Sequence, residues 1–111
     1  MLGLSLAAQG ECDRALGAYE RSLQLRPDIP ETWHNLGELY LEMGRYDDAL
    51  ARFHKALELR PGIPDTHHSM GLTHLKMGNA AAALGQCELL HVLDSGKERD
   101  LREQITKSKM P

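Results

Sequence analysis

Six histidines are the side chains in this sequence most able to bind a metal or to act in catalysis. His34 and His68 have carboxylates at helical spacing, Glu31 and Glu38 beside the first and Asp65 beside the second. Zinc needs about four ligands at ~2.0–2.2 Å in a tetrahedral arrangement, whereas the axes of packed helices lie ~8–10 Å apart. The spacing permits a zinc site without implying one. We predict solvated or hydrogen-bonded histidines and no metal.

Nucleophilic catalysis has no support in the sequence. The serines lack the turn motif of a nucleophile elbow, and neither Cys12 nor Cys87 has a convincing local histidine partner. The glycines recur along the whole chain and do not form a phosphate-binding loop. We therefore predict that the protein is not an enzyme and binds no cofactor.

The net charge and the composition restrict the classes of partner that this protein is expected to bind. The formal net charge is −3 and basic residues are interleaved with acidic ones, so neither nucleic acid nor an anionic membrane surface is expected. No stretch approaches the ~20 apolar residues that cross a bilayer. Two widely separated cysteines and no visible secretion signal favour a cytoplasmic location. Leu2 to Leu4 already resemble the interior of a helix, so we expect the sequence to be a piece of a longer protein.

The elements that must position these residues are indicated by a 34-residue period. The recurring residues are Gly3, Gly37 and Gly71; Gly10, Gly44 and Gly78; Ala15, Ala49 and Ala83; Pro27 and Pro61; and Pro30 and Pro64. A period of this length is typical of arrays built from small supersecondary units. Aromatic residues make up only 5% of the chain, and Ala, Leu, Glu and Arg are frequent, which favours helix over strand.

The middle unit is a predicted helical hairpin. Pro30 suits the first turn of a helix from about residue 31 to 43, and Gly44 ends that helix. A second helix is expected from about residue 47 to 59, ended by Pro61. One face of each helix carries the packing residues, which are Trp33, Leu36, Gly37 and Tyr40 on the first and Ala49, Phe53, Ala56 and Leu57 on the second. Small residues at Gly37 and Ala49 would let the two backbones approach closely.

The middle unit resembles the tetratricopeptide repeat at each signature position. These positions are Trp33, Leu36, Gly37, Tyr40, Gly44, Tyr46, Ala49, Phe53, Ala56 and Pro61. The third unit departs from the pattern at His67, His74, Cys87, Leu90 and Ser95. The resemblance implies an all-α fold, a right-handed superhelical stack of antiparallel helical hairpins. His67, His74 and His91 occupy positions usually filled by packing residues, so a half-buried interface is expected there.

The predicted array covers residues 1–95, with a truncated first repeat at 1–29, a second at 30–63 and a third at 64–95. Ser95 and Gly96 are interpreted as a helix stop. Residues 96–111 form a predicted capping helix and tail, in which Leu101 and Ile105 cover the last apolar face. The alternative is that this segment opens a further repeat.

In proteins of this family the first helix of each hairpin lines a concave, partner-binding groove. The positions of this sequence that would face it are Leu4, Ala8, Glu31, His34, Asn35, Glu38, Leu41, Glu42, Asp65, His68, Leu72, Leu75 and Lys76. Leucines form a strip edged by acidic residues, so we expect a protein or peptide partner that is apolar with basic flanks. The alternative is that these are ordinary surface residues.

A second functional hypothesis is self-association. The truncated first repeat would leave the apolar face of the helix from Ala15 to Leu25 partly uncovered, and such edges favour homo-oligomers. The predicted function is therefore a scaffold or adaptor that holds a protein partner. The alternative is a structural fragment that assembles through its N-terminal edge.

Overall fold

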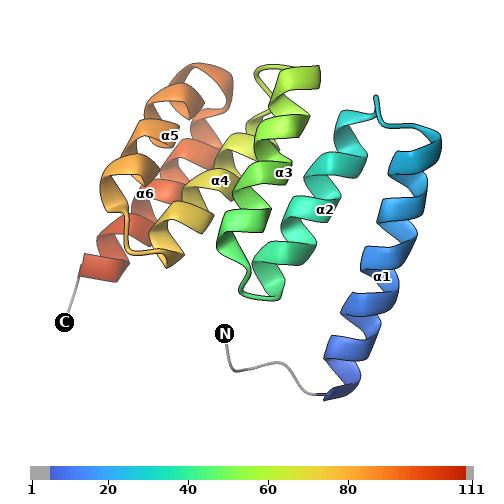
Figure 1. Cartoon of the computed structure of the whole chain (residues 1–111). Helices are drawn as coiled ribbons and strands as arrows, with labels where there is room; N and C mark the ends of the chain where they lie inside the picture. Colours follow the sequence, from blue (N-terminus) through green and yellow to red (C-terminus); the bar gives the residue numbers. More distant parts are fainter. Residues whose placement is uncertain (1–5, 110–111) are drawn as a thin grey trace. The chain divides into compact units, whose positions relative to one another are not determined.

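The computed structural model describes the backbone of residues 6–109 and the side chains of residues 10–108. Within that range the chain forms α1 (Leu6–Leu25), α2 (Pro30–Glu42), α3 (Tyr46–Leu59), α4 (Pro64–Lys76), α5 (Ala80–Leu93) and α6 (Ser95–Lys109), with no strand (Figure 1). This confirms the predicted all-α class. The helices belong to two compact units, α1 to α3 and α4 to α6, which divide after Arg60. No described helix combines the length and the apolar character needed to cross a bilayer.

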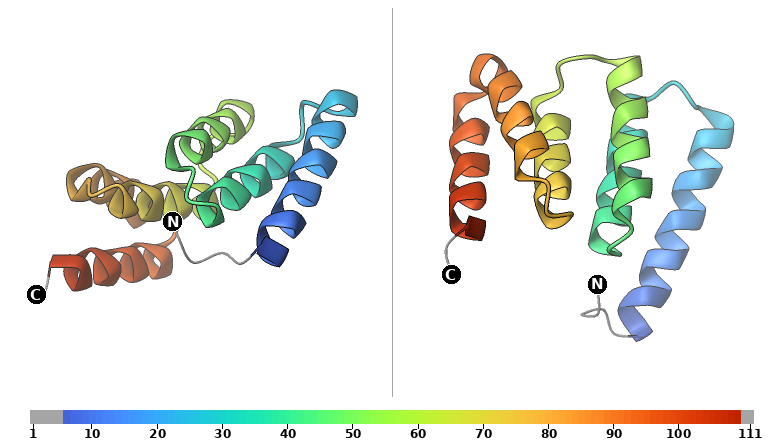
Figure 2. Two further views of the ribbon diagram at one scale, coloured as in Figure 1. Left: turned by 60° about the horizontal axis from the view of Figure 1, so that its bottom comes forward. Right: turned by 60° about the vertical axis from the view of Figure 1, so that its left-hand side comes forward.

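The α2–α3 hairpin of the first unit follows the sequence prediction within a residue. Pro30 occupies the first turn of α2, where its missing N–H leaves no hydrogen bond unmade. Gly44 adopts φ 77° and lets the chain reverse, and the Arg45 N–H donates to the Tyr40 carbonyl at 2.9 Å. The two helices then run side by side in opposite directions (Figure 2).

Gly37 sets the distance between α2 and α3. A Cβ at this position would lie 2.6 Å from Cε1 of Phe53, which is fully buried. Leu36, Tyr40 and Ala49 complete the buried surface between the helices. The predicted role of Gly37 as a small residue at the helix crossing is thus confirmed, and its partner is the phenyl ring of Phe53.

The first repeat differs from the other two at Gly10. Gly10 recurs with Gly44 and Gly78 in the 34-residue period, but α1 continues through Gly10 without a positive φ. Gly44 and Gly78 are followed by residues that begin a new helix after a turn, whereas Gly10 is followed by Glu11 in the same helix. A glycine inside a helix costs only about 1 kcal/mol relative to alanine, so the flanking residues can carry the helix across it.

The second unit replaces an aromatic residue with a side chain from another helix. Cys87 stands in α5 where Phe53 stands in α3, and it leaves space above Gly71 of α4. Leu101 of α6 fills that space, because a Cβ at Gly71 would collide with the Leu101 side chain. The buried cluster of this unit consists of Ala83, Cys87, Leu90, Leu101 and Ile105. The predicted covering role of Leu101 and Ile105 is confirmed.

The helix stop predicted at Ser95 and Gly96 is wrong, because these two residues begin a helix and the break lies one residue earlier. Asp94 is the break, and Ser95 begins α6. The Asp94 N–H donates to the Leu90 carbonyl at the end of α5. Its carboxylate accepts from the N–H groups of Gly96 at 3.1 Å and Lys97 at 3.2 Å. Aspartate is among the preferred residues at a helix start because its side chain satisfies these exposed donors.

Candidate functional site

A cleft between α1 and α2 brings together three of the predicted binding residues. Asn35, Glu38 and Glu42 line it from α2, and its volume is about 220 Å³. The apolar part of the lining comes from Ala15, Tyr19 and Leu39. Carboxylates and an amide therefore border an apolar surface. This arrangement suits an apolar side chain whose neighbour is a cation.

His34 contacts Glu38, one of the residues that line this cleft. Its Nε2 is 3.0 Å from a carboxylate oxygen of Glu38, and its ring is tilted against Phe53 with 5.6 Å between ring centroids. Leu41 is half-buried, and Glu31 at the start of α2 is exposed and 3.5 Å from Arg60. Glu38 therefore has a neighbour that holds its carboxylate in place at the cleft.

The predicted residues of α4 mainly hold α6. Nε2 of His68 is 2.6 Å from Asp100, and Asp65 forms an ion pair with Lys97 at 2.8 Å. This contact raises the pKa of Lys97, chiefly through the hydrogen bond to Asp65. Two further predicted binding residues of α4, Leu72 and Leu75, are half-buried against the cluster that contains Leu101. Lys76 is exposed.

A second cleft lies beside these α4 contacts. His68, Asp94, Gly96, Lys97 and Asp100 line about 390 Å³ at the start of α6. The sequence prediction missed the residues of α6 here, because it treated α6 as a cover for apolar surface only. The acidic and basic residues of its first turn were the available signal.

Two predicted residues lie outside what the structure describes. Leu4 falls in the undescribed N-terminal segment, and Ala8 is placed only as backbone in α1. The described side chains contain no group of three or more metal-ligating residues close enough to hold an ion. His34 and His68 each meet a carboxylate within their own unit.

The histidines of the third repeat are not equally buried. His67 is buried and joined to Gln86 by a hydrogen bond of 2.8 Å, and His74 is half-buried. The expected half-buried position of His91 is wrong, since its side chain is 74% exposed and lies 3.3 Å from Glu98. A polar imidazole near the end of α5 gains more from water and a carboxylate than from an apolar contact.

The sequence prediction also missed a cleft around Trp33. Its lining includes Leu23, Pro27, Trp33 and Arg52, and its volume is about 330 Å³. The Trp33 indole N–H donates to the Pro27 carbonyl at 2.8 Å, and the Arg52 guanidinium lies 5.9 Å from the Trp33 ring centre. Nε of Arg52 is buried without a hydrogen-bond partner. Arg52 is the counterpart of Gln86 in the 34-residue period, and both contact the residue at the Trp33 position.

Neither cysteine lines one of these clefts. Cys12 and Cys87 are both free and buried. Burial raises the pKa of Cys87, so its thiol stays protonated at neutral pH.

Comparison with known families identifies the architecture. A tetratricopeptide repeat family model matches residues 28–89, and a TPR repeat model matches residues 3–44. The chain belongs to the tetratricopeptide repeat family. The family is a protein-interaction fold, which supports a protein–protein interaction scaffold.

Solved structures extend the likeness. Two structures of MamA AMB-1 are each 26% identical to this chain, with TM-scores of 0.70 and 0.71. They match over 76% and 78% of this chain and over 49% and 48% of their own. A third, described as the crystal structure of MamA, has 24% identity and a TM-score of 0.67, and covers 87% of this chain and 52% of that chain. This chain thus spans about half the length of these structures. No curated protein matched the sequence.

Proposed function

We propose that this TPR protein is a scaffold that binds a peptide segment or partner helix along the first helices of its hairpins, with the α1–α2 cleft as the principal contact. The observation that carries the proposal is the acidic border of that cleft, where Glu38 and Glu42 stand beside the apolar surface of Ala15 and Leu39. A partner with an apolar side chain next to Lys or Arg matches both properties.

Each part of the cleft has a separate task. The apolar side chain of the partner contacts Ala15, Tyr19 and Leu39, and the neighbouring cation meets Glu38 and Glu42. Asn35 offers an amide for the partner backbone. Affinity near micromolar, about −8 kcal/mol, is expected because ordering a flexible segment offsets much of the contact free energy. We place the protein in the cytoplasm, where Cys12 and Cys87 stay reduced.

Charge reversal at the cleft tests the proposal. The probes are two sets of synthetic amphipathic helices with the same apolar face, one flanked by Lys and one by Glu, measured by fluorescence anisotropy. Glu38→Lys with Glu42→Lys should weaken binding of the Lys-flanked set by at least about tenfold and strengthen binding of the Glu-flanked set.

The matched control carries the same change in charge away from the cleft. Glu11→Lys with Glu58→Lys alters two exposed residues of α1 and α3 that do not line it. This control should keep the preference of the unaltered protein. Equal affinities in the two double variants, or no preference for Lys-flanked helices in the unaltered protein, would show that the cleft is not the binding surface.

A second candidate is homo-oligomerisation through the N-terminal edge, and one observation favours it. Ala15 and Tyr19 are half-buried in α1, whereas their counterparts Ala49, Phe53 and Ala83 are fully buried. A second copy that covered Ala15 and Tyr19 would bury this remaining apolar surface.

A further inference from the structure

The outward face of α5 is apolar along its length. Ala81, Leu84, Gly85, Glu88, Leu89 and Val92 form this stripe, and all six are exposed. Leu89 is 48% exposed and Val92 84% exposed. The opposite face of α5, with Ala83, Cys87 and Leu90, is packed against the core of its unit. The exposed stripe therefore takes no part in holding that core together.

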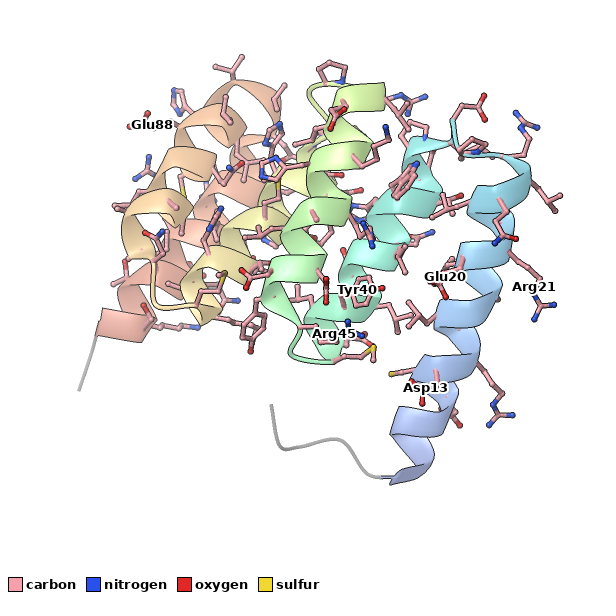
Figure 3. All side chains as sticks on the ribbon, in the orientation of Figure 1. Asp13, Glu20, Arg21, Tyr40, Arg45 and Glu88 are labelled. Atoms are coloured by element: carbon pink, nitrogen blue, oxygen red, sulfur yellow. The ribbon has the colours of Figure 1, made fainter. Side chains whose placement is uncertain are left out.

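The other two repeats do not carry such a stripe. The residues of α3 at the same places in the 34-residue period are Asp47, Leu50, Ala51, His54, Lys55 and Glu58, and those of α1 are Asp13, Leu16, Gly17, Glu20, Arg21 and Gln24. Figure 3 shows Asp13, Glu20 and Arg21 along α1, whereas Glu88 is the one charged residue of the α5 stripe. Two repeats thus keep this face polar and one does not. An exposed apolar patch on a soluble protein indicates an interaction surface.

The stripe is complementary to itself. Ala81 and Val92, Leu84 and Leu89, and Gly85 and Glu88 are three pairs centred on the same point, midway between Gln86 and Cys87. A two-fold axis through this point sets each residue opposite its pair in an antiparallel copy of α5. Each small residue, Ala81 or Gly85, then meets a larger one, and the leucines meet each other. Gly85 has open space around it, since a Cβ there would meet no atom within 4 Å.

The single charge of the stripe lies opposite a glycine of the other copy. In the two-fold pairing Glu88 faces Gly85, which has no side chain and open space around it. The Glu88 carboxylate therefore has room to keep its contact with water, and the cost of burying an unpaired charge is avoided.

We propose that this protein forms a two-fold homodimer in which the outward faces of two α5 helices pack antiparallel. A 14-residue helix is about 21 Å long. One helix pair of this length buries less than the ~1,200 Å² of a standard stable interface, so the dimer is weak, with a dissociation constant on the order of 0.1 mM. A weak dimer joins two copies of the peptide-binding surface and adds avidity for a repeated partner.

Sedimentation equilibrium of the full chain, from about 10 μM to about 1 mM, tests association. The average mass should rise from the monomer's 12.4 kDa toward twice that value. The test variant is Leu89→Lys with Val92→Glu, which installs the residues that α3 carries at Lys55 and Glu58. It should stay monomeric, with a dissociation constant raised at least about tenfold, because the apolar contact would be replaced by charged side chains that lose their hydration at the interface.

The matched control is Leu25→Lys, which replaces another exposed leucine, 81% exposed, away from the stripe. It should associate like the unaltered protein, and helicity by circular dichroism should be the same in all three proteins. An unaltered chain that stays monomeric at about 1 mM overturns the proposal. So does a Leu89→Lys, Val92→Glu variant that still associates, which would place self-association at another surface such as the N-terminal edge.

Cysteine trapping tests the antiparallel arrangement. Ala81→Cys and Val92→Cys are prepared as separate proteins, mixed and mildly oxidised. The proposed packing sets position 81 opposite position 92 of the other copy, so the mixed disulfide should exceed either symmetric one by at least about tenfold. Predominantly symmetric disulfides would contradict this arrangement.

Discussion

At the scale of single residues, two glycines control how closely helices approach. Gly37 receives the ring of Phe53 from the other helix of its hairpin, and Gly71 receives Leu101 from α6. The two glycines share a place in the repeat, but the side chains that cover them come from different helices. A buried Cβ at either position has no room unless its neighbour moves.

Gly37→Ala should lower the free energy of unfolding by about 1–3 kcal/mol, because Phe53 is fully buried and has no open space into which to turn. This loss outweighs the gain of up to about 1 kcal/mol that alanine brings to a helix interior. Urea denaturation followed by circular dichroism measures the difference.

Gly17→Ala is the matched control, because Gly17 lies inside α1 and a Cβ there would meet no atom within 4 Å. It should stabilise the protein by about 0.5–1 kcal/mol. If both substitutions stabilised the protein, the close approach at Gly37 would not limit packing.

At the scale of helices, polar side chains decide where α5 and α6 begin. The Asn79 carboxamide accepts from the Ala82 N–H at 3.1 Å, and Asp94 does the same for the start of α6. Within α6, Glu98 accepts from Arg102 at 2.8 Å, and its carboxylate also lies 3.3 Å from Nδ1 of His91 in α5. The contact with His91 joins α6 to α5 at the edge of the apolar cluster.

Acid should weaken the contacts that Glu98 makes with Arg102 and His91. The hydrogen bond from Arg102, followed by that from His91, holds the pKa of Glu98 below its usual value of 4.5. The charged carboxylate therefore stabilises the fold above about pH 4.5, and this contribution is lost as the pH falls through the lowered pKa. Glu98→Gln should melt at a lower temperature than the unaltered protein near pH 7, and the difference should shrink as the pH falls below about 4.5 and vanish once the Glu98 carboxylate is protonated.

Glu103→Gln provides the comparison for this titration, since Glu103 is exposed on the same helix. Its melting temperature should follow that of the unaltered protein from about pH 7 to about pH 3. A difference for Glu98→Gln that persisted at low pH would mean that the carboxylate charge is not what stabilises α6.

At the scale of the whole molecule, the 34-residue sequence period predicted the repeats better than it predicted where the helices begin and end. Proline and glycine placed α2 and α3 within about one residue, because helix ends follow local backbone preferences. The helix stop at Ser95 was misjudged, since a helix break also depends on the residues that follow. The cleft at Asn35, Glu38 and Glu42 was partly predicted from their shared helix face.

The contacts of α6 were beyond the sequence pattern. Asp65 and His68 were expected to meet a partner, but they meet Lys97 and Asp100. Nothing in the local sequence around Asp65 specifies which charged residue of a later helix will lie beside it. Tertiary packing decides such pairs.

The two compact units predict uneven protection against hydrogen exchange. Gly71→Ala should speed exchange of the α4 to α6 amides by about tenfold or more through the collision with Leu101, and change that of α2 and α3 much less. Mass spectrometry of peptic fragments resolves the two regions. Equal acceleration in all helices would show one cooperative unit.

The contacts at the Trp33 position bear on how the repeats could be recombined. Trp33 lies under Arg52, and in the next repeat His67 bonds to Gln86. His67→Trp alone would remove the hydrogen-bond partner of the Gln86 carboxamide, and Trp33→His alone would remove the indole that lies against Arg52. In a designed chimaera of these hairpins, the two contacting residues from opposite helices must therefore be transferred together.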